Sequence, residues 1–158
     1  MRYIMTAFMC LVVNLCSYSR DVGIASGPEE TILNELVSRK NEFIHQKLSK
    51  VYEFLKQKKK FVINHATTTE TNPWNPCSDG KLYIESIVLF SKDFYELNED
   101  GEDYYEITIE LDMNHKVERQ SFWSNIPDDE TWIQVFVDQS KDFIVKNLSW
   151  SFNVGRKW

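Results

Sequence analysis

Residues 103–113 alternate between apolar and polar side chains, and this pattern constrains the fold more than any other stretch of the chain. An extended strand points successive side chains to opposite faces, so this strand has one apolar face and one polar face. The apolar face consists of Tyr105, Ile107, Ile109, Leu111 and Met113. Such a face must be covered by apolar side chains from elsewhere in the chain. The pattern therefore predicts a sheet that is covered on one side.

Residues 81–91 precede this strand and are apolar on both faces through their middle, which predicts a central strand. The acidic segment between the two runs contains Asp100-Gly101, a pair typical of tight hairpin turns. A calcium-binding loop is the alternative. With Gly101 at the sixth position of such a loop, the closing twelfth position falls on Ile107, which has no carboxylate. A hairpin is therefore preferred.

Residues 29–58 are the only long amphipathic stretch and the natural cover for the sheet. Apolar residues recur there at three- and four-residue steps, from Leu33 to Leu55, with Lys, Glu and Gln between them. Pro28 and the two glutamates after it suit the first turn of a helix, and the lysines at 56 and 58–60 suit the last. One helix is predicted, and a break into two helices near Arg39-Lys40-Asn41 is the alternative.

The remaining segments are assigned by composition. Residues 61–63 are predicted to be a short strand, and the polar, proline-containing residues 64–80 a loop. Further strands are predicted at about 117–124, 131–137 and 142–150, because these residues are rich in β-branched and aromatic side chains. A helix opened by Pro127 is the alternative over 131–144. The fold class is therefore α+β: a long N-terminal helix packed on an antiparallel meander of four to five strands.

The first 19 residues are typical of a secretory signal peptide, with Arg2 before an apolar run and small residues before the expected cleavage site. Residues 20–28 are then a flexible lead, residues 29–150 a single domain and residues 151–158 a tail. No later segment is long and apolar enough to span a membrane. The net charge of −6 argues against nucleic acid as a partner. We expect a secreted or lumenal protein.

A helix followed by an antiparallel meander resembles the cystatin-like and NTF2-like families in the order of its elements. The resemblance implies a curved sheet wrapped around a helix. Inhibitory cystatins also carry a Gln-x-Val-x-Gly hairpin, whereas the corresponding segment here, 134–138, ends in Asp138. The resemblance therefore implies a fold and does not extend to protease inhibition.

Three kinds of residue are candidates for modification or contact. Cys77 is the only cysteine outside the signal peptide, so it is either unpaired or forms an intermolecular disulfide. Asn147-Leu148-Ser149 is an acceptor triplet for N-glycosylation, which requires Asn147 to face solvent at a sheet edge. The candidate partner contacts are Trp74, Trp158, Lys58, Lys59 and Lys60.

The sequence contains no recognisable cofactor motif, metal motif or nucleophile motif, and the three histidines are far apart. This favours a small secreted protein that works by binding, either to a macromolecular partner or to a small apolar ligand between helix and sheet. One alternative is a hydrolase or lyase whose site assembles only in three dimensions. The other is a structural subunit cross-linked through Cys77.

Overall fold

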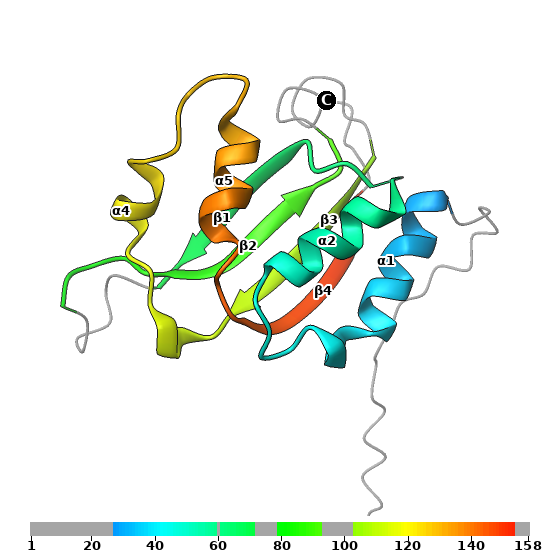
Figure 1. Cartoon of the computed structure of the whole chain (residues 1–158), viewed down its shortest axis with the longest axis horizontal. Coiled ribbons are helices and arrows are strands. Elements are labelled where there is room, and N and C mark those ends of the chain that lie inside the picture. The colour runs from blue at the N-terminus through cyan, green and yellow to red at the C-terminus, as the bar shows by residue number, and fades with distance from the viewer. Residues whose placement is uncertain (1–26, 60, 72–78, 93–102, 154–158) are drawn as a thin grey trace, which may run out of the picture.

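The computed structural model describes residues 27–59, 61–71, 79–92 and 103–153. These residues form an α+β fold with helices on one side of a four-stranded antiparallel sheet (Figure 1). The elements in chain order are α1 (Pro28–Ser38), η1 (Lys40–Glu42), α2 (Ser49–Lys58), β1 (His65–Glu70), β2 (Ile84–Phe90), β3 (Tyr104–Leu111), η2 (Met113–His115), α4 (Arg119–Trp123), α5 (Trp132–Ser140) and β4 (Val145–Asn153).

The sheet has the strand order β1-β2-β3-β4, with every neighbouring pair antiparallel. The predicted central position of residues 81–91 is confirmed, because β2 pairs with β1 on one side and β3 on the other. The predicted alternation of 103–113 is confirmed as far as Leu111, because Ile107, Ile109 and Leu111 are buried and the residues between them are not, whereas Met113 lies in η2 beyond the strand. The Asp100-Gly101 turn and residues 96–102 of the alternative calcium loop lie outside the described residues, whereas residues 103–107 of that loop are described and its closing position, Ile107, is buried in β3.

The predicted helix over 29–58 is broken at the place that the sequence indicates. α1 ends at Ser38, the turn η1 follows, and α2 begins at Ser49. Arg39 lies at the break, where its guanidinium pairs with Glu35 at 3.3 Å and Glu42 at 2.8 Å. The chain between η1 and α2 then runs beside the start of β4, because the N–H of Leu48 donates to the carbonyl of Phe143 at 2.7 Å. Two helices therefore supply the cover in place of one.

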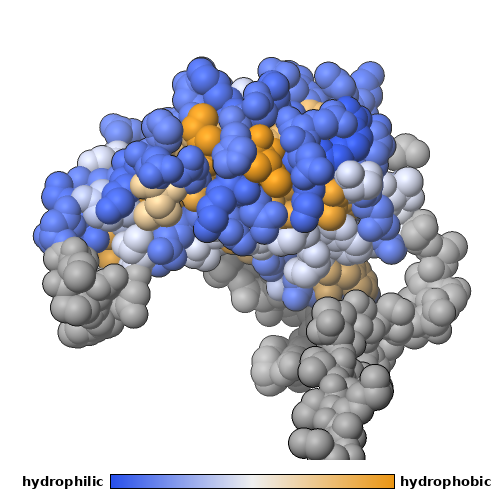
Figure 2. Space-filling view, turned by 90° about the horizontal axis from the view of Figure 1, so that it is seen from below, coloured by the Kyte–Doolittle hydropathy of each residue, from blue (hydrophilic) through white to orange (hydrophobic). Residues whose placement is uncertain are grey.

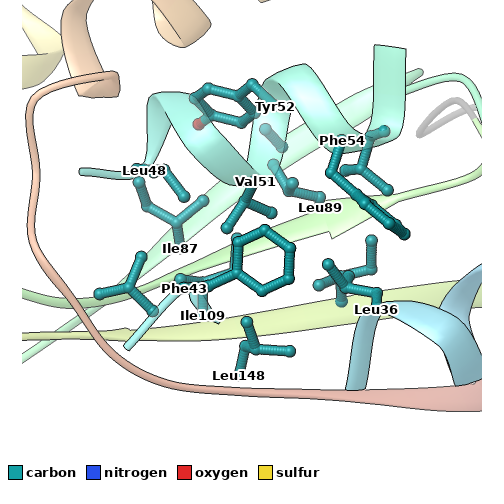
Figure 3. Packing of buried hydrophobic residues seen from close by; sticks show 14 of the residues in the cluster. Leu36, Phe43, Leu48, Val51, Tyr52, Phe54, Ile87, Leu89, Ile109 and Leu148 are labelled. Carbon is teal, nitrogen blue, oxygen red and sulfur yellow. The ribbon is translucent and has the colours of Figure 1, made fainter. Parts of the chain in front are cut away.

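The space between these helices and the sheet is filled by side chains of the protein itself (Figure 3). Leu36 of α1 and Val51 of α2 are fully buried against Ile87, Ile109 and their neighbours in the sheet. Phe43, from the segment between the helices, packs edge-on against Phe54 with 5.7 Å between ring centroids. The same core continues through α4 and α5, so the described elements share one hydrophobic interior.

The predicted strand at 131–137 is wrong, because these residues begin the helix α5. The apolar side chains there also fit a helical stripe, and Phe136 at its centre is fully buried against the rings of Phe122 and Trp123. An Asp129 carboxylate that accepts the N–H of Thr131 at 2.8 Å opens the helix. Tertiary packing of one helix face therefore outweighs the β-propensity of the residues.

The predicted strand at 117–124 is also wrong. Glu118 forms an isolated bridge with Tyr83, and the chain then turns into the short helix α4. The turn buries Phe122 and brings Trp123 to Thr68, which accepts its indole N–H at 3.0 Å. β3 and β4 are therefore neighbours joined through η2, α4 and α5, so the meander is interrupted by helices.

The order of strand and loop after α2 is the reverse of the prediction. Residues 61–63 are not a strand, and β1 instead lies within the predicted loop 64–80. The strand is polar by composition, but Ala66 and Thr68 alternate inward and are buried. The predicted last strand is confirmed as β4, although it continues to Asn153, three residues into the predicted tail. Among the described helices, none combines the length and apolarity needed to cross a membrane.

Candidate functional site

Three aromatic side chains meet where the end of β4 pairs with the start of β3. Tyr105 lies opposite Phe152 in the strand register, and Trp150 lies opposite Ile107. The ring of Tyr105 is 5.0 Å from that of Phe152 and 5.9 Å from that of Trp150. We call this group, Tyr105, Trp150 and Phe152, the aromatic corner. Strand pairing creates it, since the three residues are dispersed over the sequence.

The aromatic corner lies on the same sheet face as the core but is only partly covered. Tyr105 and Trp150 are half-buried and pack against the core, whereas Phe152 is 45% exposed. Phe152 and Val62 are the two exposed large apolar side chains of the described chain. The face shown in Figure 2 is mostly hydrophilic, and hydrophobic residues are visible on it between polar ones. An exposed aromatic ring beside two others is therefore unusual for this molecule.

Three carboxylates act electrostatically on Tyr105, one member of the aromatic corner. Gly27 precedes α1 beside Tyr105, because a methyl group added to this glycine would lie 3.6 Å from the Tyr105 hydroxyl. Glu29 and Glu30 in the first turn of α1 and Asp103 before β3 therefore lie near the phenol. The pKa of Tyr105 is raised, first by burial and then by the negative charges of Glu30, Glu29 and Asp103. We call these three residues the acidic rim.

An aromatic corner with an acidic rim can bind a cation. The face of an aromatic ring attracts ammonium and guanidinium groups within about 6 Å, at roughly 0.5–2 kcal/mol for each contact. Carboxylates near the rings add Coulomb attraction, which salt screens at an exposed site. The two glutamates also suit the positive end of the α1 dipole, and the aromatic pairs also stabilise the sheet. Neither role accounts for the exposure of Phe152.

The lysines predicted to contact a partner occupy different environments. Lys58 is engaged within the fold, because its ammonium pairs with Glu35 at 2.5 Å and lies 5.1 Å from the centroid of the Phe54 ring. Lys59 is exposed and ends α2 in a left-handed conformation with a φ of 54°. Lys60, Trp74, Cys77 and Trp158 lie outside the described residues. Of this set, Lys59 remains as an accessible cation.

Asn147 lies in β4, which is an edge strand, and the residue is half-buried. Its amide donates a hydrogen bond to the Glu110 carboxylate across the strand pair at 3.3 Å. It is on the opposite sheet face from the aromatic corner. Glycosylation of Asn147 stays a prediction.

The histidines do not gather into a site. His45 and His115 are exposed, in the segment between the helices and in η2. His65 lies in β1 with its ring 5.6 Å from that of Phe90 and 5.2 Å from that of Trp132. Within the described ranges, no group of three His, Cys, Asp or Glu side chains is placed to hold a metal ion.

A shallow polar hollow of about 350 Å³ lies between the start of β2 and α4. Its charged side chains are already paired, Lys81 with Glu118 at 3.2 Å and Arg119 with Glu70 at 3.0 Å. A ligand there would have to displace these internal partners. The hollow is lined by Gly80, Lys81, Leu82, Glu118, Arg119 and Gln120.

The sequence patterns assign the residues of the aromatic corner and the acidic rim to other roles. Tyr105 is recognisable as part of a buried strand face, Glu29 and Glu30 as a helix start, and Phe152 as part of a tail. The missing information is the pairing of Tyr105 with Phe152, which depends on the register of β4. The late concentration of tryptophans is a signal for aromatic packing but does not indicate a position.

Comparison with known proteins adds no identification. No protein-family model, no curated protein and no solved structure matches the chain.

Proposed function

We propose that this chain is a small secreted binding protein whose aromatic corner and acidic rim bind a basic segment of a partner protein. The observation that carries the proposal is the exposed ring of Phe152, packed on Tyr105 in the vicinity of three carboxylates. A lysine or arginine side chain fits this chemistry, because its alkyl stem can contact the rings while its charge faces the carboxylates.

A protein segment is a better candidate than a small apolar ligand. The residues between the helices and the sheet, such as Leu36, Val51 and Ile109, are fully buried against one another (Figure 3). A ligand at that position would have to displace well-packed side chains. The aromatic corner is at the surface and needs no such rearrangement. Binding there is therefore compatible with the core as it stands.

Binding is also favoured over catalysis by the titrating groups of the described chain. The carboxylates whose pKa is lowered are exposed, and each has a hydrogen-bond donor beside it that accounts for the shift. The donors are Lys58 for Glu35, Arg39 for Glu42, Tyr83 for Asp79, Thr131 for Asp129 and Lys47 for Asp142. Such shifts hold carboxylates ionised, whereas a general acid or base works best with a pKa near neutral pH.

The proposal is tested by titrating the purified chain with an oligo-arginine peptide and with an oligo-glutamate peptide of equal length. We expect saturable binding of the basic peptide, weakening with salt, and no binding of the acidic one. Phe152→Ser should weaken the affinity by about fivefold or more, equivalent to ~1 kcal/mol of lost ring contact. Calorimetry or tryptophan fluorescence measures the dissociation constant.

Two matched controls separate this site from general attraction to an acidic protein. Val62→Ser removes the other exposed apolar side chain, which precedes β1 at the opposite edge of the sheet. Replacing Glu53 and Glu130 by Gln changes the charge as much as replacing Glu29 and Glu30. Only the changes at the aromatic corner and acidic rim should weaken binding. Equal losses from both pairs of glutamates would refute the proposed site.

A further inference from the structure

The second face of the sheet is not covered by any described helix. All the helices lie on the face shown toward the viewer in Figure 1. The opposite face carries Val88, Phe90 and Tyr104 among otherwise polar side chains. These polar side chains include Thr69, Ser86, Glu110, Asn147 and Ser149, of which Ser86 is buried. We call this the polar face.

Asn147 stands at the outer end of a polar row that crosses this face. The register places Thr69 opposite Ser86, Ser86 opposite Glu110, and Glu110 opposite Asn147. Thr69 and Ser86 share a hydrogen bond of 2.7 Å between their hydroxyls. The amide of Asn147 donates to Glu110 at 3.3 Å, a long and therefore weak bond. The row is thus polar from one edge of the sheet to the other.

The triplet Asn147-Leu148-Ser149 is arranged so that its two reactive members share the polar face. Residues two apart in a strand point the same way, so Asn147 and Ser149 face outward together. Leu148 between them points into the core, where it is 2% exposed. Ser149 is exposed, and the outer edge of β4 is paired only at its first residue, Val145, which exchanges backbone hydrogen bonds with His45 and Gln46 among the described residues.

We propose that Asn147 is an N-glycosylation acceptor and that its glycan lies over the outer edge of the polar face. The donor class is an oligosaccharide linked through a diphosphate to a lipid. The Asn147 amide nitrogen forms a bond to C1 of the first sugar and loses a proton, while the bond from C1 to the diphosphate oxygen breaks. The lipid diphosphate leaves with its electron pair. This step rests on the secretory route of the proposed function.

The full chain, expressed with its own signal peptide in a secreting eukaryotic cell line, tests the inference. We expect a mass shift that an amidase specific for N-glycans removes, converting Asn147 to aspartate. Asn147→Gln and Ser149→Ala should lose the glycan completely, because each destroys the acceptor triplet. Ser149→Thr preserves the triplet and Ser151→Ala leaves it intact, so both should keep the glycan.

A reporter variant separates failure of this inference from failure of the secretory route. Lys116→Thr completes a second acceptor triplet at Asn114, which is exposed in η2. Glycan at Asn114 with none at Asn147 would overturn the inference and leave secretion intact. Absence of glycan at both Asn114 and Asn147 would overturn the inference and the secretory route. Glycan at Asn147 supports the inference and the secretory route, whatever the outcome of the peptide titration.

Discussion

The hydrogen bond between Tyr52 of α2 and Ser140 of α5 gives a sharp test of how these two helices are joined. Their hydroxyl oxygens are 2.7 Å apart, and both residues are buried. Ser140 donates its own proton to the carbonyl of Phe136 at 2.7 Å. Tyr52 must therefore be the donor in the shared bond. The two possible substitutions therefore differ: Ser140 keeps its hydrogen bond to Phe136 when the Tyr52 hydroxyl is removed, whereas Tyr52 has no second contact of this strength when the Ser140 hydroxyl is removed.

The magnitudes follow from which polar group each substitution leaves unpaired. Tyr52→Phe removes one hydrogen bond, but Ser140 keeps its bond to Phe136, so we expect a loss of about 0.5–1.5 kcal/mol. Ser140→Ala leaves the buried Tyr52 hydroxyl without its partner, which costs about 1–3 kcal/mol. The higher helix propensity of alanine offsets about 0.5 kcal/mol of this loss. Ser140→Ala should therefore be the more damaging of the two.

A double-mutant cycle measured by urea unfolding shows whether the Tyr52 and Ser140 hydroxyls are coupled. Removing both hydroxyls leaves no unpaired group, so the double variant should lose less than the sum of the two single losses, by about 1 kcal/mol or more. Tyr83→Phe, which removes a surface hydrogen bond to Asp79, is the control for loss of a phenol. Additive losses for the two buried substitutions would refute the reasoning.

The contribution of Tyr52 to the free energy of unfolding depends on pH. Burial raises the pKa of Tyr52, although the hydrogen bond with Ser140 opposes the shift. A group whose pKa is raised by folding stabilises the fold fully below its unfolded value, about 10 for tyrosine. The contribution is lost as pH rises above that value. We expect the stability of the wild type relative to Tyr52→Phe to be constant near neutral pH and to fall above about pH 10.

Three further predictions concern the helices. Lys59→Gly should raise the free energy of unfolding by about 0.5–1 kcal/mol in urea, because glycine adopts the left-handed conformation at the end of α2 without steric cost; a loss would contradict this. Phe136→Ala should cost about 3–5 kcal/mol by the same assay, since its fully buried ring joins α5 to α4. The pKa of Glu35 is lowered, chiefly by the hydrogen bond from Lys58. The wild type should therefore be more stable than Glu35→Gln at neutral pH, and this difference in the free energy of unfolding should be lost as pH falls below about 4. The same difference at pH 2 and at pH 7 would contradict the prediction.

The elements predicted correctly are those whose hydrophobic period is strong. The strand over 103–113 and the helical cover over 29–58, which was predicted as one helix with a break as the alternative, both have a clear alternation or stripe, and packing reinforces it. The failures come where two signals disagree. Residues 131–137 have strand propensity but a helical period, and the buried contacts of Phe136 decide for the helix. β1 has a polar composition, but its threonines are β-branched and suit a strand.

The candidate site was beyond prediction for a different reason. Each residue of the aromatic corner and acidic rim has an ordinary role in its own element, and only the pairing of β3 with β4 brings them together. That pairing includes an irregularity: Glu110 lies opposite Asn147, but Leu111 lies opposite Val145, so Lys146 is an extra residue. In a regular strand pairing, Lys146 would lie opposite Leu111, and Val145, which is buried here, would point to the opposite face. A bulge of this kind leaves no recognisable mark in a single sequence.

The register of β4 also places the two proposed sites on opposite faces of the sheet. Trp150 and Phe152 point to the helix-covered face, whereas Asn147, Ser149 and Ser151 point to the polar face. A glycan on Asn147 would therefore leave the aromatic corner accessible. Removing the glycan enzymatically from the folded chain should leave the affinity for the basic peptide unchanged. A large change in affinity would mean that both ligands contact the same surface, which this register does not allow.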